Sequence, residues 1–516
     1  MKKLNIAFIV VASVILSSCS DILDKEPLNS RNEAVFYKTE QDMFEAVISI
    51  YDAAQLTSAH QVTADILSDD GYAGGSSRND IPEQIQIDNH QILATNYIAE
   101  EIWDFNYTGI YRSNIVLQKL PDIEDGNAET LARFEAEAKF FRGYFFWNLV
   151  RFFENVPLVT RTLSPSEYGM PQSPPADVYN QIFTDIVESI DALPTEMQPD
   201  GRVTKWAAQA MLARIWMFHN GVYGDAISVN GTNINADYIR TALDDVIDNS
   251  THGLVPDVTT IFTKAGEMSM ESVFELQYSD LAAYGDWGWP YGGEGNFPVV
   301  WQGPRVKDPA QEEYFRGWSF NTVTKALYDE FDDADPRKDA YIISQDDFAT
   351  DISKGFQHTG YFTNKYTTRK EYQATDGSPE LNYGNNFKVI RFADVLLMSA
   401  EMHVVTGGSR AQEHLDAVRS RVGLDPVSPT LDNIYKERRL ELCMEGVRYH
   451  DLLRRGLDIA DANITVSGNY GEFFDYKESE ESDFDINFNR DTKGFLPIPQ
   501  NEIDLLNGIY DQNAGY

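Results

Sequence analysis

The feature that most constrains the fold of this chain is a series of helical periodicities that come in adjacent pairs. Residues 98–119 and 128–153 each repeat apolar side chains at the spacing of one helix face, and residues 175–193 and 203–220 form a second pair. The last segment has small residues, mainly alanine, at positions where two helices must approach closely. Helix pairs with small and aromatic contacts predict tetratricopeptide-like packing, although the spacing is too irregular for strict repeats of about 34 residues. We therefore expect a mainly α-helical scaffold of degenerate helix pairs.

Between residues 251 and 385 the composition of the chain changes. This stretch is rich in Gly, Asp, Tyr and Trp and shows few helical periods apart from a short run at 323–331. A segment of this length without structure of its own is uncommon in a compact domain, so we expect an inserted, ligand-facing layer of loops, short helices and small strands. Helical patterns return near the end of the chain, at residues 389–405, 410–421 and 431–455 and from about Asn501. No linker divides residues 36–516, which are predicted to form one domain.

The N-terminus has the layout of an export signal for a lipid-modified protein. Two lysines precede an uncharged apolar run at 4–16, and a helix of that length, about 20 Å, is shorter than a hydrocarbon core of about 30 Å. Cys19 follows small residues in a pattern that resembles the bacterial lipobox, which implies cleavage before Cys19 and lipid on its sulfur. An ordinary signal with an incidental cysteine is the alternative. We expect residues 1–18 to be a signal peptide and 19–35 a lipidated tether.

The formal net charge of −39 limits the partners of the chain. Such an acidic protein repels the phosphates of nucleic acids, and no basic tract offsets the repulsion, so no nucleic-acid partner is expected. The second cysteine, Cys443, falls in a predicted helix. We expect it to be a small buried residue rather than a nucleophile, although His450 lies two helical turns further on.

The sequence shows no motif of a metal or cofactor site. Its eight histidines form no HExxH and no close cluster, and CxxC, GxSxG, P-loop and GxGxxG patterns are missing. Asp332, Asp333 and Asp335 precede Pro336, where a helix-ending turn is favoured over a calcium site because the EF-hand spacing is missing. We therefore expect no cofactor and no metal.

Five stretches occur in the same order as in a known family and, with the lipobox, extend over nearly the whole chain. They are AKFFRGYFFWNLVRFFENVPLVT (138–160), RVTKWAAQAMLARIW (202–216), NFKVIRFADVLLMSAE (386–401), ERRLELCMEGVRYHDLLRRG (437–456) and FLPIPQNEI (495–503). With these motifs the chain resembles the SusD/RagB family of surface glycan-binding lipoproteins. The resemblance implies a SusD-like fold, capture of an oligosaccharide without catalysis, and a lipid anchor on the outer face of the cell outer membrane. It also implies a partner, a TonB-dependent transporter of the SusC type, over whose mouth the lipoprotein would sit as a lid.

The stretch 437–455 also has a physical interpretation that does not depend on the family. Glu437, Glu441 and Glu445 are spaced four residues apart and have arginines nearby, which is typical of one salt-bridged helix. A glycoside hydrolase needs two carboxylates that face each other across a cleft, and one helix face does not provide that arrangement. These glutamates are therefore predicted to be structural.

The segment 284–301 is the best candidate for a sugar site. It contains six aromatic residues in 18, where the chain average of 12% predicts about two: Tyr284, Trp287, Trp289, Tyr291, Phe297 and Trp301. Sugars present flat arrays of C–H groups edged by hydroxyls, and their sites combine exposed rings with carboxylates, amides or arginines. Here glycines rather than Leu and Ile separate the rings, which favours exposure, although some rings are expected to pin the loop to the helices.

Two further pairs of residues resemble sugar contacts of the family. Asp70 and Arg78, with Asp69 beside them, flank a GYAGGSS loop and are similar to polar contacts near the N-terminal side of the family's site. Trp103 and Asn106 are similar to a tryptophan and an asparagine that face glycan. The alternatives are a solvated turn for Asp70 and helix packing for Trp103.

Three functions remain open from the sequence. The first is a non-catalytic oligosaccharide-binding lipoprotein that serves an outer-membrane transporter. The second is a secreted glycoside hydrolase, because among 81 acidic residues a catalytic pair can be present without a motif. The third is a helical-repeat adaptor that binds a peptide or protein in its grooves.

Overall fold

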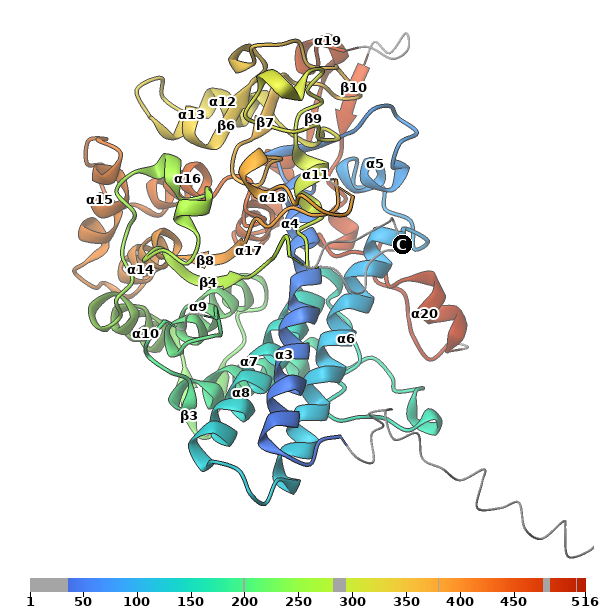
Figure 1. The fold of residues 1–516 in the computed structure, drawn as a ribbon, viewed down its shortest axis with the longest axis vertical. Helices are drawn as coiled ribbons and strands as arrows, with labels where there is room; N and C mark the ends of the chain where they lie inside the picture. The colour runs from blue at the N-terminus through green and yellow to red at the C-terminus, as the bar shows by residue number, and fades with distance from the viewer. Residues whose placement is uncertain (1–35, 198–199, 282–293, 379, 477–482, 507) are drawn as a thin grey trace, which may run out of the picture.

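Long helices in the lower half of the molecule form the scaffold, and most of them are the helices that the sequence predicts (Figure 1). The computed structural model describes residues 36–516 except 198–199, 282–293, 379, 477–482 and 507. The two predicted pairs are confirmed as α6 (Tyr97–Lys119) on α7 (Ala128–Phe153) and α8 (Pro175–Ser189) on α9 (Lys205–Val222). The predicted signal peptide, the lipidation site Cys19 and the tether lie outside the described residues.

Side-chain caps explain where the long helices begin. Asn96 accepts hydrogen bonds from the first backbone N–H groups of α6, and Asn127 does the same for α7. A further helix, α3 (Glu40–Gln55), lies outside the predicted set. It begins with a capping box between Thr39 and Asp42 and packs against both α6 and α7.

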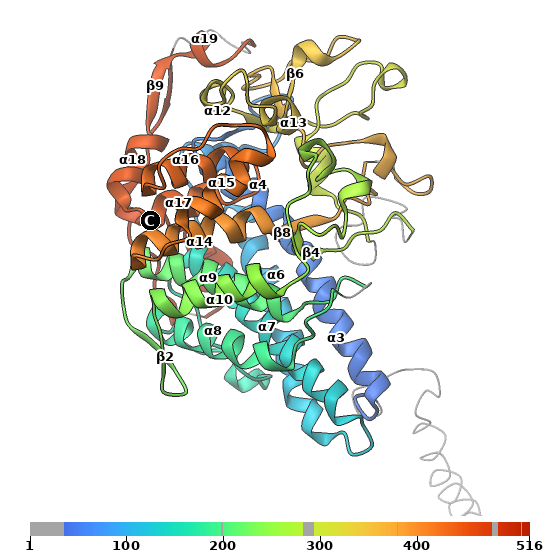
Figure 2. The same cartoon turned by 90° about the vertical axis from the view of Figure 1, so that its left-hand side faces the viewer.

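The scaffold is interrupted in the sequence and continuous in space. α10 (Ala236–Asn249) packs on α9 and on α14 (Phe392–Thr406), which packs on α15 (Ala411–Arg421). Figure 2 shows α8, α9, α10 and α14 stacked one above another, although the whole stretch 251–385 separates α10 from α14 in the sequence. The fold is therefore mainly α-helical with tetratricopeptide-like pairs, as predicted.

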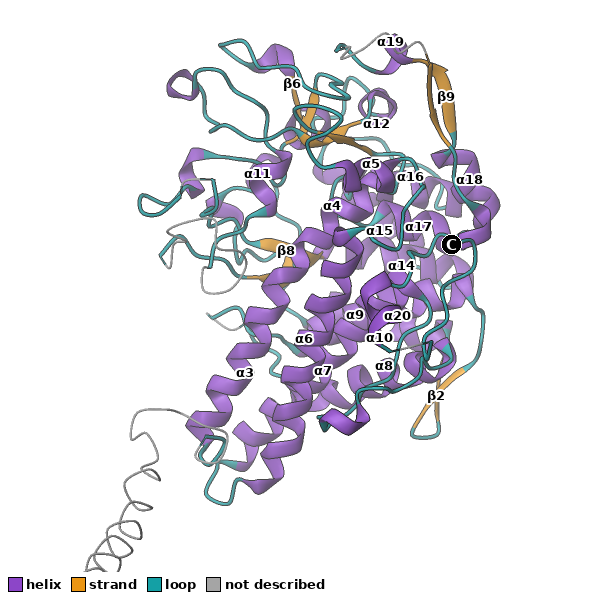
Figure 3. Cartoon of the chain, turned by 90° about the vertical axis from the view of Figure 1, so that its right-hand side faces the viewer, coloured by secondary structure: helices purple, strands orange, loops and turns teal. Residues whose placement is uncertain are grey.

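The stretch 251–385 contributes loops and short elements to the upper part of the molecule (Figure 3). Its helices are α11 (Pro298–Gln302), α12 (Lys325–Glu330) and α13 (Arg337–Tyr341). Within the described residues each sheet has two antiparallel strands: β1 (Gly71–Gly74) with β5 (Phe320–Val323), β2 (Ile227–Val229) with β3 (Thr232–Ile234), β4 (Ser272–Leu276) with β8 (Phe387–Arg391), β6 (Ile342–Ser344) with β7 (Tyr361–Thr363), and β9 (Val466–Asn469) with β10 (Asp483–Ile486). The expected layer of loops, short helices and small strands is confirmed.

The prediction of one helix over 431–455 is wrong. The structure has α16 (Leu431–Glu441) and α17 (Arg448–Arg454), joined by a turn in which Met444 and Gly446 have φ of 57° and 72°. Such left-handed values are incompatible with a continuous right-handed helix. The predicted helix 389–405 also begins late, because the chain first pairs with β4 as β8.

Five shorter helices complete the described fold: α4 (Ala59–Ile66), α5 (Pro82–Asp88), α18 (Leu457–Ile464), α19 (Tyr470–Phe473) and α20 (Gln500–Leu505). α20 follows Pro499, close to the predicted start at Asn501. Across the described ranges, no helix has the length and apolarity needed to cross a bilayer.

A buried ionic network ties the upper part of the molecule to the C-terminal helices. Glu441 on α16 pairs with Arg337 of α13 at 2.9 Å, with Arg391 of β8 at 2.6 Å and with Arg421 of α15 at 2.5 Å. Glu445, which the break places in the turn, pairs with Arg391 at 2.9 Å. Burial alone would raise the pKa of Glu441, but the three guanidinium groups hold it well below its usual range. The glutamates of this stretch are structural, as predicted.

Candidate functional site

Four of the predicted sugar contacts lie in the segment 282–293, outside the described residues: Tyr284, Trp287, Trp289 and Tyr291. The residues on either side of this segment are described, and a backbone hydrogen bond holds the two sides together. The backbone N–H of Ser279 donates to the carbonyl of Glu294 at 2.8 Å, and we call this pair the clasp. The side chain of Gln55, at the end of α3, donates to the Glu294 carboxylate at 2.9 Å. The scaffold thus fixes both ends of the aromatic segment.

Three aromatic residues form a cluster directly after the clasp. The ring of Phe297 lies 5.4 Å from that of Trp301 and 5.6 Å from that of Trp318, with interplanar angles of 75° and 79°. Trp301, a predicted contact, lies on α11 and is only 8% exposed. Its ring therefore packs against Phe297 on the buried side of the cluster. Trp318 is half-buried and stands on the side that solvent reaches. The sequence predictions missed Trp318, although Gly317 before it repeats the Gly-aromatic pattern of 284–301.

A pair of glycines brings Trp318 to the cluster. Gly303 and Gly317 lie on neighbouring segments, where a Cβ on Gly317 would stand 2.2 Å from the backbone of Gly303. The backbone N–H of Trp318 donates to the carbonyl of Val300 at 2.8 Å, which fixes the two segments in register. Only glycines permit this separation, so the position of the Trp318 ring depends on them.

Polar side chains from the loop after β1 lie beside this cluster. Arg305 donates to Ser319, the neighbour of Trp318, at 2.9 Å and pairs with Asp80 at 3.3 Å. The guanidinium of Arg78, a predicted contact, lies 5.3 Å from the ring centre of Phe356. The structure therefore brings the loop of Arg78 together with the segment that holds Trp301 and Trp318.

Three predicted sugar contacts are buried in the core, where their side chains are not open to solvent. Asp70 is 0% exposed and pairs with Arg439 at 2.8 Å. Trp103 is 3% exposed and packs edge-on against Phe153 at 5.3 Å. Asn106 is 0% exposed and donates to the carbonyl of Ile102 in its own helix at 2.6 Å. Helix packing, the alternative reading of Trp103, is what the structure shows.

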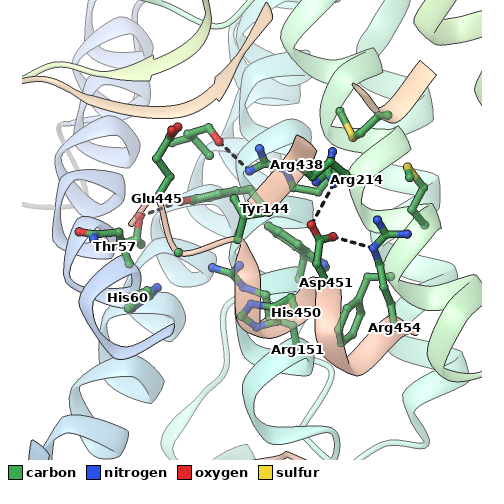
Figure 4. Close-up of a pocket in the computed structure, with 18 of the residues that line it drawn as sticks. Thr57, His60, Tyr144, Arg151, Arg214, Arg438, Glu445, His450, Asp451 and Arg454 are labelled. Atoms are coloured by element: carbon green, nitrogen blue, oxygen red, sulfur yellow. Dashed lines mark hydrogen bonds and ion pairs between the residues drawn. The ribbon is translucent and has the colours of Figure 1, made fainter. Parts of the chain in front are cut away.

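A small hollow lies inside the scaffold, between α4, α7, α9 and α17 (Figure 4). Its volume is about 50 Å³, which is room for one or two water molecules at about 30 Å³ each. His60, Arg151 and His450 line it together with the ion pairs that Asp451 makes with Arg438 and Arg454. Burial holds the pKa of both histidines well below the usual value. The hollow is too small for a sugar ring and is not the oligosaccharide site.

The carboxyl groups with strongly raised pKa values are placed poorly for glycoside hydrolysis. Burial raises the pKa of Asp65 and of Asp88 to about 7, but both side chains are 1% exposed and cannot reach a substrate. Burial also raises the pKa of Glu101 to about 7, with Asp104 one turn further along the same face of α6. Carboxylates on one helix face do not bracket a glycosidic bond.

Three other side chains of chemical interest are now placed. Cys443 is 1% exposed, and burial raises the pKa of its thiol to about 12, so it is an inert core residue as predicted. His403 and His414 lie eleven residues apart in the sequence, where they form no motif. In the structure they come together with Asp244, a grouping that their spacing in the sequence does not reveal.

Sequence comparison assigns the chain to a class. The model of the SusD family matches residues 338–516, and a SusD-like model described as starch-binding and associating with the outer membrane matches residues 21–217. The chain belongs to the SusD/RagB family.

Particular relatives then place it within that family. A solved laminarin-binding SusD-like protein is 32% identical, with a TM-score of 0.79 over 93% of this chain and 100% of its own. Surface glycan-binding protein A from Bacteroides thetaiotaomicron, solved with laminarihexaose, is 28% identical, with a TM-score of 0.80 over 92% and 100%. SusD-like protein P25 of Formosa agariphila is 24% identical over 89% of this chain and 90% of its own.

Proposed function

We propose that this protein is a non-catalytic lipoprotein of the outer-membrane surface that captures an oligosaccharide. The observation that supports this best is the aromatic cluster of Phe297, Trp301 and half-buried Trp318 beside the clasp. A ring face of this kind stacks on the C–H face of a sugar, while Arg78 and Asp80 at the side supply hydrogen bonds to its hydroxyls.

Laminarin-type oligosaccharides are the ligands that we propose. Two solved relatives bind laminarin or laminarihexaose, and both align with more than nine-tenths of this chain. The predicted rings Tyr284, Trp287, Trp289 and Tyr291 complete the binding surface in this proposal.

The captured oligosaccharide then passes to a TonB-dependent transporter of the SusC type. Membership of a family described as associating with the outer membrane supports the location. Lipid on Cys19 would confine capture to the membrane surface, where the effective concentration of ligand near a transporter is high.

Titration calorimetry with laminarihexaose tests the binding site. Trp318→Ala should weaken binding by about 1 kcal/mol or more, which is about fivefold, because a stacked ring is lost. Tyr111→Ala removes a ring that is 56% exposed on α6, away from the cluster, and should leave the affinity unchanged. Trp287→Ala and Trp289→Ala extend the scan. If none of the tryptophan variants weakens binding, the proposed site is wrong.

A reducing-end assay tests the non-catalytic part of the proposal. The protein is incubated with laminarin, and new reducing ends are measured over hours. We expect none, because the carboxyl groups of Asp65 and Asp88, whose pKa is raised to about 7, are buried and cannot reach a substrate. Release of oligosaccharides would contradict the binding-only function and favour the alternative, a secreted glycoside hydrolase.

A further inference from the structure

Three potential metal ligands meet where three scaffold helices pack together. Asp244 lies on α10, His403 on α14 and His414 on α15, and these helices are neighbours in Figure 2. One ligand atom of each side chain lies within 4.8 Å of the other two. Nε2 of His403 is 3.0 Å from Oδ1 of Asp244, and the two imidazole rings are 5.4 Å apart at 64°. Because the ligands stand on helices of the scaffold, their positions are set before any ion binds.

Three of the four imidazole nitrogens of this cluster have no hydrogen-bond partner among the described residues. His403 is 4% and His414 is 2% exposed. Neither nitrogen of His414, and not Nδ1 of His403, has a hydrogen-bond partner among the described residues. A buried polar atom without a partner costs about 1–3 kcal/mol, so two such histidines side by side call for a ligand that binds imidazole.

The charges around the cluster favour a cation. Asp244 also lines an open groove along α10 together with Asp237, Asp245 and Asp248, so one of the three ligands faces solvent and ions there. Three cations pair with these carboxylates: Arg410 with Asp248 at 2.9 Å and with Oδ1 of Asp244 at 3.4 Å, Arg240 with Asp237 at 2.8 Å, and Lys205 with Asp245 at 2.9 Å. With Glu413, which also pairs with Arg410, the carboxylates still outnumber the cations. Oδ2 of Asp244 accepts no hydrogen bond from the described residues and is available as a ligand.

We propose that Asp244, His403 and His414 bind one zinc ion. Two neutral imidazoles and a carboxylate form a ligand set that zinc takes at about 2.0–2.2 Å, whereas calcium and magnesium prefer oxygen ligands alone. Ligands at that bond length in a tetrahedron lie about 3–3.5 Å apart, close to the 3.0 Å between His403 and Asp244. Water from the acidic groove fills the fourth position. The ion holds α10 to α14 and α15.

Zinc binding is measured on the full-length protein, purified through a tag without histidines and treated with a chelator. We expect one zinc per chain by elemental analysis after dialysis. Asp244→Asn, His403→Gln and His414→Gln should each weaken zinc binding by more than about tenfold, because each removes a ligand. His358→Gln is the matched control, since His358 is as buried as His414 and lies in the upper part of the molecule.

Two further measurements keep the test decisive if a variant folds poorly. Cobalt added to the wild type should give the visible absorption of tetrahedral nitrogen and oxygen ligation. Zinc, and not calcium, should raise the melting temperature of the wild type and of His358→Gln. The proposal is overturned if the wild type binds no zinc, or if it binds zinc and each of the three ligand variants binds it equally well.

Discussion

The carboxyl group of Asp88 is buried at the end of α5, where Gln357 donates to its Oδ2 at 2.6 Å and Ala73 N–H donates at 3.3 Å. Burial raises its pKa to about 7 despite these hydrogen bonds. Between about pH 4 and pH 7, the Asp88 carboxyl is therefore protonated in the folded protein and ionised in the unfolded chain. The contribution of Asp88 to stability is present below pH 4 and is lost as the pH rises to about 7.

Asp88→Asn should remove this pH dependence. The amide imitates the protonated carboxyl, so the variant should gain stability relative to the wild type between pH 4 and pH 7. Because one pKa unit corresponds to about 1.4 kcal/mol, the gain should reach a few kcal/mol. Urea unfolding at a series of pH values measures it. Asp125→Asn, on an exposed side chain, should leave the profile unchanged, and a parallel shift at all pH values would contradict the assignment.

Glu441 forms ion pairs with three arginines within 2.9 Å, more than the other carboxylates of the stretch 437–456. Glu441→Gln should destabilise the fold by about 3–5 kcal/mol, because it leaves buried guanidinium groups without a counter-charge. Thermal or urea unfolding measures the loss. Asp329→Asn breaks an exposed pair with Lys325 and should cost less than about 0.5 kcal/mol. Equal effects of the two variants would show that the buried network adds nothing.

At the scale of elements, the sequence predicts helices well where caps and periodicity agree. The predicted limits 128–153 are those of α7, because Asn127 caps the helix and its apolar face is continuous. The break between α16 and α17 escapes such reasoning, since the apolar and charged spacing continues across it. Its only local signal is Gly446, and the left-handed φ of Met444 is set by packing.

Site residues are harder to predict than helices, because exposure is a property of the folded molecule. Trp103 and Asn106 match a binding pattern in the sequence, yet α7 and the C-terminal segment cover that face of α6. The segment of Trp301 and the loop of Arg78 are predicted and do come together. The pairing of His403 with His414 follows from the packing of α14 on α15, which no spacing in the sequence reveals.

The contact between α6 and α7 depends on one glycine. A Cβ on Gly109 would stand 2.3 Å from the ring of Phe145, which is 0% exposed and has no room to move. Gly109→Ala should therefore destabilise the protein by about 1–3 kcal/mol, although alanine is the better helix former. Calorimetric melting tests this. Gly471→Ala in α19, where the nearest atom is 3.5 Å away, should change stability by less than about 0.5 kcal/mol, and a similar loss there would contradict the steric explanation.

At the scale of the whole molecule, the proposed lipid anchor on Cys19 would decide where the proposed binding surface works. Cys19→Ala should release the protein from the membrane fraction and abolish incorporation of labelled palmitate in cells, because two or more acyl chains are needed for stable anchoring. Cys443→Ala should keep the protein in the membrane, since that thiol is buried. A wild type that takes up no palmitate and is released like the Cys19 variant would support the alternative of an ordinary signal.

The clasp holds the two ends of the stretch between Ser279 and Glu294 together on the scaffold. These ends meet beside α3, where Gln55 donates to the carboxylate of Glu294, so the scaffold itself closes the loop. Doubling the length of such a loop costs only about 0.6 kcal/mol of closure entropy. Under the proposed function, insertions between the two ends would therefore change the ligand surface at little cost in stability, while the helical scaffold stays the same.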